Sequence, residues 1–334
     1  MPEQSRKTLV TGASGFVGAA VVRALLARGE TVRVLMRPSS DRQNIAGLDV
    51  DIVEADLMEP HTLPAAVAGC SAVYHVAADY RLWTRDPEAM FRANVDGSTA
   101  IIRASMKAGV ERIVYTSSVA VLGIVPGGEG DEETPVSYAD MIGVYKQSKY
   151  RAEEAVKELI ENENASVVIV NPSTPVGPRD VKPTPTGRMI VEAASGKMPA
   201  FVDTGLNIVH VDDVAAGHLL AFDKGVIGER YVLGGENMAL KDILADIAEI
   251  AGRKPPAVCL PHNLIIPIAH LAEWWTRLTG GSEPFATVDG VRMAKKKMYF
   301  SSAKAERELG YAPRPAKQAL QDAVRWFQEN GYCS

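Results

Sequence analysis

Cysteine is scarce in this sequence, and the three that occur, Cys70, Cys259 and Cys333, are scattered. None belongs to a Cys-x-x-Cys pair, so neither a disulfide framework nor a zinc site is indicated, and we expect no metal. An excess of positive charge is also missing: the formal net charge is −5, which gives no electrostatic reason to expect a nucleic-acid partner. A small molecule is therefore the expected partner.

A hydrophobic run long enough to cross a membrane is missing as well. The most apolar stretch outside the N-terminal half, Leu264 to Ala272, contains Pro267 and His270, so it predicts a buried or partner-facing helix. Met1 to Lys7 is polar and leads directly into an apolar strand, which leaves no room for a signal peptide. These absences predict a cytoplasmic protein without a transmembrane segment.

The N-terminal half alternates short β-branched runs with helical patterns, which is typical of parallel βαβ units. Strands are predicted at 8–10, 31–36, 50–53, 72–76, 112–116 and 167–170, and later helices at 88–107 and 144–162. The expected fold is therefore α/β, with a Rossmann-type, doubly wound parallel sheet.

The pattern changes after residue 171. Five prolines from Pro172 to Pro185 predict a loop that is neither regular helix nor central strand. Strand and helix patterns at 208–222 and 231–233 could return to the first sheet. We therefore expect an NAD(P)-binding domain at 1–174, to which 207–235 return, and a smaller, discontinuous C-terminal substrate-binding region at 175–206 and 236–334.

Three glycines lie where the first strand meets the first helix, in the sequence Gly12-Ala13-Ser14-Gly15-Phe16-Val17-Gly18. At this junction of a βαβ unit, a dinucleotide pyrophosphate binds at the helix N-terminus, and glycine lets the backbone approach it. The motif predicts a cofactor site formed by Gly12, Ser14, Gly15, Phe16, Val17 and Gly18.

Tyr145 and Lys149 are four residues apart, which places them on one face of a helix. The unperturbed pKa of tyrosine is ~10, and a neighbouring ammonium would lower it toward the range of useful acid–base chemistry. Ser118 follows the fifth strand, at the carboxyl edge where ligands of doubly wound sheets bind, and its hydroxyl could polarise a reacting oxygen. We expect Ser118, Tyr145 and Lys149 to be catalytic.

Together these motifs resemble the extended short-chain dehydrogenase/reductases, and the likeness spans nearly the whole chain. The resemblance implies that Asp56 and Leu57 contact the adenine, and that Ala77, Ala78 and Pro172 line the cofactor, as Tyr145 and Lys149 do. It also matches Asn94 to a helix-bending asparagine. For His75 we expect only a hydrogen-bonded histidine at a strand end, and Asp212 and Asp213 could cap the helix that follows them.

The residue after the second strand bears on the choice of cofactor. This position is acidic in NAD enzymes, because a carboxylate accepts hydrogen bonds from the ribose 2′-hydroxyl. Here it is Arg37, with Arg42 nearby, and a guanidinium can bind a 2′-phosphate bidentately. NADP is favoured. NAD stays the alternative, since Arg37 could instead stack on the adenine or face solvent.

A narrower resemblance comes from 77–83, 171–175 and 293–298, which are similar to the hopanoid-associated sugar epimerases, relatives of the dihydroflavonol reductases. A C-terminal segment, 302–311, resembles sugar-nucleotide epimerases. The resemblance implies a sugar-type or ketone substrate that could be lipid-linked, a role beside hopanoid lipid synthesis, and a homodimer. The substrate residues expected are Asp79, Tyr80, Trp83, Ser118 and Thr174.

Three departures from the family pattern limit the reaction. Val119-Ala120 replaces the Asp-Glu pair of the dehydratases, no cysteine lies near the site to serve a Cys-His epimerase, and 205–210 lacks the arginine of many sugar-nucleotide enzymes. Two chemistries stay open: sugar epimerisation, slightly preferred, and NADPH-linked reduction of a ketone. A non-catalytic nicotinamide sensor is a weaker alternative.

Overall fold

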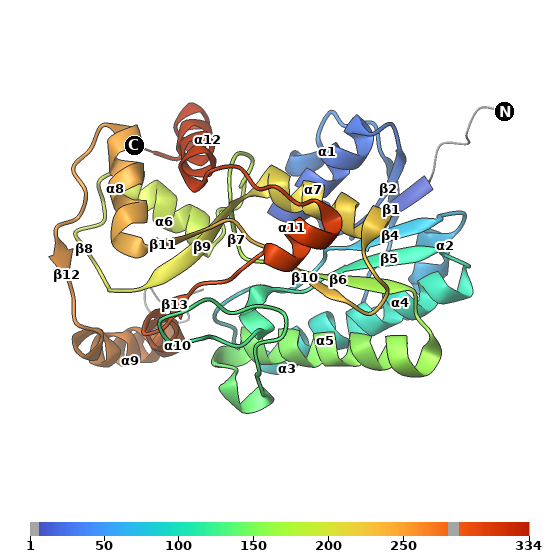
Figure 1. Cartoon of the computed structure of the whole chain (residues 1–334), viewed down its shortest axis with the longest axis horizontal. Helices are drawn as coiled ribbons and strands as arrows, with labels where there is room; N and C mark the ends of the chain where they lie inside the picture. Colours follow the sequence, from blue (N-terminus) through green and yellow to red (C-terminus); the bar gives the residue numbers. More distant parts are fainter. Residues whose placement is uncertain (1–6, 280–286, 334) are drawn as a thin grey trace.

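The computed structural model describes residues 7–279 and 287–333, so most of the polar N-terminal segment discussed above lies outside the described residues. Its main feature is a seven-stranded sheet in the order β10-β6-β5-β4-β1-β2-β3 (Figure 1). All neighbouring strands in it are parallel. The strands are β1 (Lys7–Thr11), β2 (Thr31–Met36), β3 (Asp51–Glu54), β4 (Ala72–His75), β5 (Arg112–Thr116), β6 (Val167–Pro172) and β10 (Arg230–Leu233).

Helices cover both faces of this sheet. One face carries α1 (Phe16–Ala27), α7 (Val211–Lys224) and α11 (Ala303–Leu309). The other carries α2 (Leu63–Val67), α4 (Gly97–Lys107) and α5 (Gly143–Glu163). Strands buried on both faces need apolar residues throughout, and all six residues of β6 are buried. The strand order reverses between β1 and β4, where doubly wound sheets bind ligands, so the predicted Rossmann-type fold is confirmed.

A smaller sheet and several helices form the rest of the molecule. The sheet contains β7 (Thr174–Val176), β9 (Gly205–His210), β11 (Glu236–Ala239) and β13 (Lys297–Met298). Its core includes α6 (Pro185–Ala194), α8 (Leu240–Ala251) and α12 (Ala316–Glu329). Beyond it lie the paired strands β8 (Ala200–Phe201) and β12 (Val258–Cys259), and the helices α9 (His262–Thr279) and α10 (Val288–Ala294).

One local expectation was wrong. The proline-rich segment after residue 171 is not all loop: β7 contains Pro175 and, among the described strands, pairs only with β9, and Pro185 occupies the first turn of α6. Proline is compatible with an edge strand and with a helix start, where its missing N–H leaves no hydrogen bond unmade. Of the elements within 207–235, β10 joins the seven-stranded sheet and α7 packs against that sheet. The strand β9 belongs to the smaller sheet.

The predicted helix at 88–107 consists of α3 (Pro87–Phe91), a π-helical turn (Arg92–Asp96) and α4 in direct succession. Asn94 lies in the π-helical turn, where the resemblance placed a bend. The helix expected at 264–272 is longer than that stretch and contains Pro267. Within the described ranges, no helix has both the length and the apolar character that crossing a bilayer requires.

Candidate active site

The glycine loop packs too closely for larger residues. Gly12 has a φ of 72°, and a Cβ there would lie 2.7 Å from the Ala77 nitrogen. A Cβ on Gly18 would lie 2.1 Å from the Gly12 carbonyl oxygen. Gly15 begins α1 without a side-chain cap, and the first turn of α1 contains no acidic residue. The amides at this helix end are therefore suited to an anionic group such as a pyrophosphate.

A buried polar chain fixes the segment opposite this loop. Thr11 Oγ1 lies 2.7 Å from His75 Nδ1, and His75 Nε2 lies 2.9 Å from Ser98 Oγ. Thr11 Oγ1 also accepts a hydrogen bond from the Ala77 N–H, which sets the position of Ala77 and Ala78. Burial lowers the pKa of His75 to about 3, so the ring is neutral at physiological pH. The expectation of a hydrogen-bonded histidine is confirmed.

The carboxyl ends of β2 and β3 carry the residues expected at the adenosine. Arg37 is exposed directly after β2, and within the described ranges no ion pair holds its guanidinium. Arg42 instead pairs with Glu54 at 3.1 Å, beside an open hollow of about 550 Å³. Asp56 and Leu57 follow β3 at the same edge and are partly buried. The Arg37 guanidinium is thus exposed at this edge of the sheet, whereas Arg42 is engaged by Glu54.

Ser118 and Tyr145 are brought together. Ser118 follows β5, and its Oγ accepts a hydrogen bond from the Ala120 N–H at 3.1 Å. Tyr145 lies in the first turn of α5. Burial raises the pKa of the Tyr145 phenol, and a hydrogen bond with the Ser118 side chain lowers it in part. The hydroxyl and the phenol can therefore approach one substrate oxygen together.

Lys149 is buried one turn further along α5. Its Nζ donates hydrogen bonds to Tyr115 Oη at 3.2 Å and to the Thr116 carbonyl oxygen at 2.9 Å. Burial lowers the pKa of Lys149 to about 8, and nearby Glu153 acts in the opposite direction. The expectation that this ammonium lowers the pKa of Tyr145 is not met here, because two groups of β5 hold Nζ and the Tyr145 shift comes from burial and Ser118.

Sequence reasoning missed the groups that support this arrangement. Asn171, at the end of β6, donates from Nδ2 to the Ser118 carbonyl oxygen at 3.0 Å and to Glu153 Oε2 at 2.9 Å. Arg230 lies 3.2 Å from the same buried carboxylate. Glu153 is four residues after Lys149, so continuing the helical spacing would have found it. Tyr115 and Asn171 come from strands, and no local spacing connects them to α5.

Asn94 connects the segment after β4 to α5. It accepts from the Asp79 N–H at 2.7 Å, and its Nδ2 donates to the Asp79 carbonyl oxygen and to Ser148 Oγ, both at 2.9 Å. The Asp79 carboxylate pairs with Arg81, and the Trp83 ring lies 5.9 Å from the Arg85 guanidinium carbon. Tyr80 is exposed.

Pro172 and Thr174 lie at the junction of β6 and β7, close along the chain to Asn171. Pro172 ends β6 and Thr174 begins β7, so both are at the carboxyl end of the main sheet. The cofactor role of Pro172 and the substrate roles of Asp79, Tyr80, Trp83 and Thr174 stay predictions.

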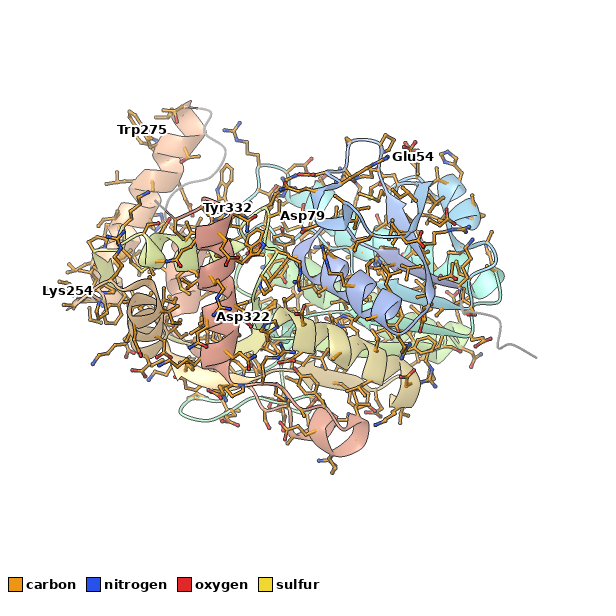
Figure 2. All side chains as sticks on the ribbon, turned by 90° about the horizontal axis from the view of Figure 1, so that it is seen from above. Glu54, Asp79, Lys254, Trp275, Asp322 and Tyr332 are labelled. Carbon is orange, nitrogen blue, oxygen red and sulfur yellow. The ribbon has the colours of Figure 1, made fainter. Side chains whose placement is uncertain are left out.

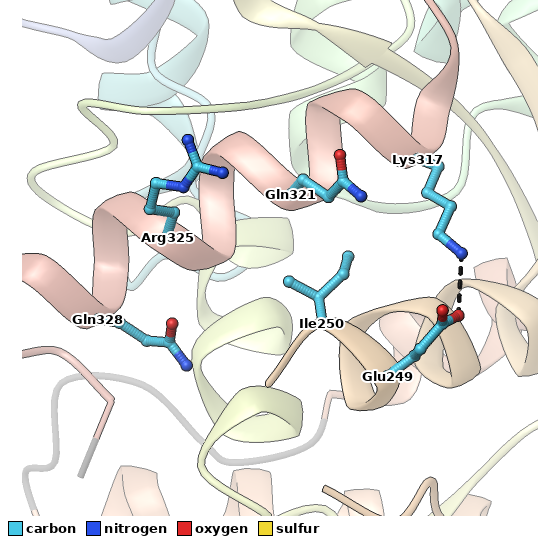
Figure 3. Close-up of a pocket in the computed structure, with 6 residues that line it drawn as sticks. All are labelled: Glu249, Ile250, Lys317, Gln321, Arg325 and Gln328. Carbon is cyan, nitrogen blue, oxygen red and sulfur yellow. Dashed lines mark hydrogen bonds and ion pairs between the residues drawn. The ribbon is translucent and has the colours of Figure 1, made fainter. Parts of the chain in front are cut away.

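Other candidate features lie away from these residues. Among residues 7–279 and 287–333, no group of three or more His, Cys, Asp or Glu side chains could hold a metal ion. A hollow of about 370 Å³ between α8 and α12 includes the Lys317–Glu249 ion pair of 2.9 Å, and none of the predicted site residues lines it (Figure 3). Asp212 and Asp213 do not cap α7. The cap is His210, whose Nδ1 accepts a hydrogen bond from the Asp212 N–H.

Comparison with known proteins identifies the family. The model of the NAD dependent epimerase/dehydratase family matches residues 8–234. The chain belongs to this family. A Synechocystis sp. protein named "Putative dihydroflavonol 4-reductase" is 46% identical over 97% of this chain and 95% of its own length. The sterol demethylase protein B of Methylococcus capsulatus is 37% identical over 97% and 99%.

Solved structures agree with this assignment. The crystal structure of gox2253 has a TM-score of 0.89 and 55% identity, covering 99% of this chain and all of its own. A nucleoside-diphosphate-sugar epimerase from Pseudomonas aeruginosa has a TM-score of 0.82 and 28% identity, covering 98% and 99%. The protein is therefore an enzyme of the extended short-chain dehydrogenase/reductase type, in a family that uses a pyridine nucleotide.

Proposed function

We propose that this enzyme reduces a ketone to a secondary alcohol with NADPH. The observation that carries the proposal is the placement of Ser118 directly after β5, at the carboxyl edge of the sheet, near enough to Tyr145 of α5 to lower the pKa of its phenol, with Lys149 one turn further along the same helix. Full-length likeness to a protein named as a dihydroflavonol reductase supports reduction over the epimerisation that the sequence slightly favoured. The sequence has no cysteine near the site for a Cys-His epimerase and no Asp-Glu pair after Ser118 for a dehydratase, and both absences support the same choice.

In this proposal each side chain has a role set by its atoms. When bound, the nicotinamide cofactor would supply the hydride that reduces the carbonyl carbon. Tyr145 Oη gives its proton to the substrate oxygen, and Ser118 Oγ donates a hydrogen bond to that oxygen and polarises the carbonyl. The Lys149 ammonium, held by Tyr115 Oη and the Thr116 carbonyl oxygen one turn after Tyr145, would bind the nicotinamide ribose. The glycine loop, Arg37 and Ala77 would hold the cofactor.

NADP is the proposed cofactor because the Arg37 guanidinium is exposed at the end of β2 where an NAD enzyme has a carboxylate. The pocket proposed for substrate uses Asp79, Tyr80, Trp83 and Thr174. A homodimer and a division between cofactor-binding and substrate-binding regions are also proposed.

A sugar epimerase is the second candidate. Likeness to the Pseudomonas aeruginosa sugar epimerase and the C-terminal segment at 302–311 support it, together with the proposed link to hopanoid lipid synthesis. An epimerase must keep its reduced nicotinamide while the substrate turns, whereas a reductase releases it each turnover.

Cofactor retention separates the two candidates. Freshly purified protein is dialysed and denatured, and the released nicotinamide is assayed. A reductase should release little and should consume added NADPH with ketone substrates. Near-stoichiometric nicotinamide that survives dialysis, without NADPH consumption, would overturn the proposal and favour the epimerase.

A further inference from the structure

Helix α9 presents an apolar stripe to solvent. Its inner side packs on α10 through Ala269, with Ile265 and Ile266 beside it. Six of the thirteen large hydrophobic side chains exposed in the described chain lie on its other side: Leu264, Ile268, Leu271, Trp274, Trp275 and Leu278. Leu271 is 65% and Trp275 63% exposed. Steps of three and four residues keep five of the six on one face, and Trp275 points away from the rest of the molecule (Figure 2).

A basic cluster lies against the N-terminal end of the same helix. Lys295, Lys296 and Lys297 are exposed, in a chain whose net charge is −5. The cluster is fixed to α9 by the Lys295 Nζ hydrogen bond to Asn263 Oδ1 at 3.2 Å and by the 3.0 Å contact of His262 Nε2 with the Ala294 carbonyl oxygen. The acidic residue of α9, Glu273, accepts from the Val288 N–H and so is turned toward α10.

The pair of helices adjoins the catalytic helix. Asp289, in α10, packs against Gly143, where an added Cβ would meet Asp289 Oδ2 at 3.2 Å. Gly143 is the first residue of α5, two positions before Tyr145. Whatever α9 binds is therefore held on the side of the molecule where α5 begins.

We propose that α9 seats the enzyme on the surface of an anionic lipid bilayer. The apolar stripe enters the boundary between headgroups and acyl chains, and Lys295 to Lys297 lie against anionic headgroups. An amphipathic helix with tryptophan on its apolar face and lysines beside it has the composition of interfacial helices. Asp140 lies within electrostatic reach of Lys296, and Lys295 and Lys297 have no ion pair among the described residues. A second copy of the chain that covers the stripe is the competing occupant, and the experiment below distinguishes it from a bilayer. This inference goes beyond the proposed function and does not depend on it.

Sedimentation with vesicles tests the inference on the full chain. The protein is mixed at low ionic strength with vesicles of phosphatidylcholine alone or with about one third phosphatidylglycerol. We expect binding to the anionic vesicles, with a blue shift of tryptophan fluorescence. Trp274→Ser with Trp275→Ser should weaken binding about tenfold or more, and Lys295→Gln with Lys297→Gln should remove the preference for anionic lipid.

A matched control comes from two other exposed apolar residues. Val226→Ser with Ile227→Ser should bind vesicles as the unmodified protein does, and Leu271→Gln replaces the tryptophan variant should that variant fail to fold. Equal binding by the α9 and control variants, or no sedimentation with either vesicle, would overturn the proposal. So would a dimer seen by light scattering that is lost in the α9 variant while no vesicle binding is detected.

Discussion

The Tyr145 phenol is the group of this site placed to transfer a proton, since its neighbour Ser118 can only share a hydrogen bond at neutral pH. Tyr145→Phe should lower kcat at least ~100-fold and leave cofactor affinity within about twofold, because only the hydroxyl is lost. Steady-state kinetics and calorimetric titration measure the two effects. Tyr150→Phe, on the same helix, is the control. More than roughly a tenth of kcat left in Tyr145→Phe would rule out proton transfer by this residue.

Burial of the Lys149 ammonium should lower the stability of the folded protein, although the proposed reaction requires this residue. Its folded-state pKa is about 8, below the ordinary 10.5, so the unfolded chain binds more protons between these values and stability rises with pH across that window. Below about pH 8 the cost of burying the charge is fully present. Lys149→Met should therefore raise Tm at pH 7, by an amount that shrinks toward pH 10, while turnover is lost.

Thermal melts at pH 7, 8, 9 and 10 measure this difference, with the exposed Lys107→Met as control. A lower Tm for Lys149→Met at pH 7 would mean that its hydrogen bonds to Tyr115 and Thr116 outweigh the burial cost.

Arg37 decides the cofactor in the proposed function. NADP should bind at least ~10-fold more tightly than NAD, a difference of about 1.4 kcal/mol, and Arg37→Asp should invert the order. Arg42→Gln should have a smaller effect, because Glu54 already engages that guanidinium. Calorimetric titration of both cofactors measures the preference, and equal affinities in the unmodified protein would contradict it.

At the scale of elements, the π-helical turn before α4 connects the proposed substrate loop to α5, which carries the proposed catalytic pair. Asn94→Leu removes the bonds to Asp79 and Ser148 and leaves buried polar groups unpaired, at a cost of about 1–3 kcal/mol per group. We expect KM for the substrate to rise more than the cofactor Kd, because Ala77 is held separately by Thr11. Kinetics, titration and chemical denaturation test this together. A cofactor Kd that rises as much as KM would contradict it.

The order and type of the elements in the first half could be predicted from the sequence, because hydrophobic periodicity and the glycine and proline residues that end helices and strands are local features. The membership of β9 in the smaller sheet was not, since a strand's partners depend on contacts far along the chain. Pro175 argued against a strand at β7 in the sequence, although proline is compatible with a strand at the edge of a sheet.

The same limit applies within the site. Helical spacing predicted that Tyr145 and Lys149 share one helix face. The groups that bind the Lys149 ammonium could not be predicted in this way, because they come from β5, more than thirty positions earlier. The βαβ context and helical spacing predicted the glycine loop and the catalytic set, and the resemblance to a known family supported both. It could not show which side chains already engage Arg42 or surround Lys149.

At the scale of the whole molecule, the cores of the two sheets are not built from separate parts of the chain. The core beside α1 and α7 includes Ala305, Leu309 and Tyr311, and the Tyr311 hydroxyl donates to the Gly234 carbonyl oxygen at 3.0 Å. Arg314, further on, pairs with Asp213 of α7 at 2.7 Å. Residues near the C-terminus therefore complete the core on this face of the seven-stranded sheet.

This sharing predicts one cooperative unfolding transition for the full chain, with calorimetric and van't Hoff enthalpies that agree. Leu309→Ala should shift that single transition and cost about 2–5 kcal/mol, because its side chain is fully buried beside α7. Glu308→Ala, one residue earlier and exposed in its position on α11, is the control and should change little. Two separate transitions, of which Leu309→Ala moved only one, would show that the regions unfold independently and that the C-terminal segment does not couple them.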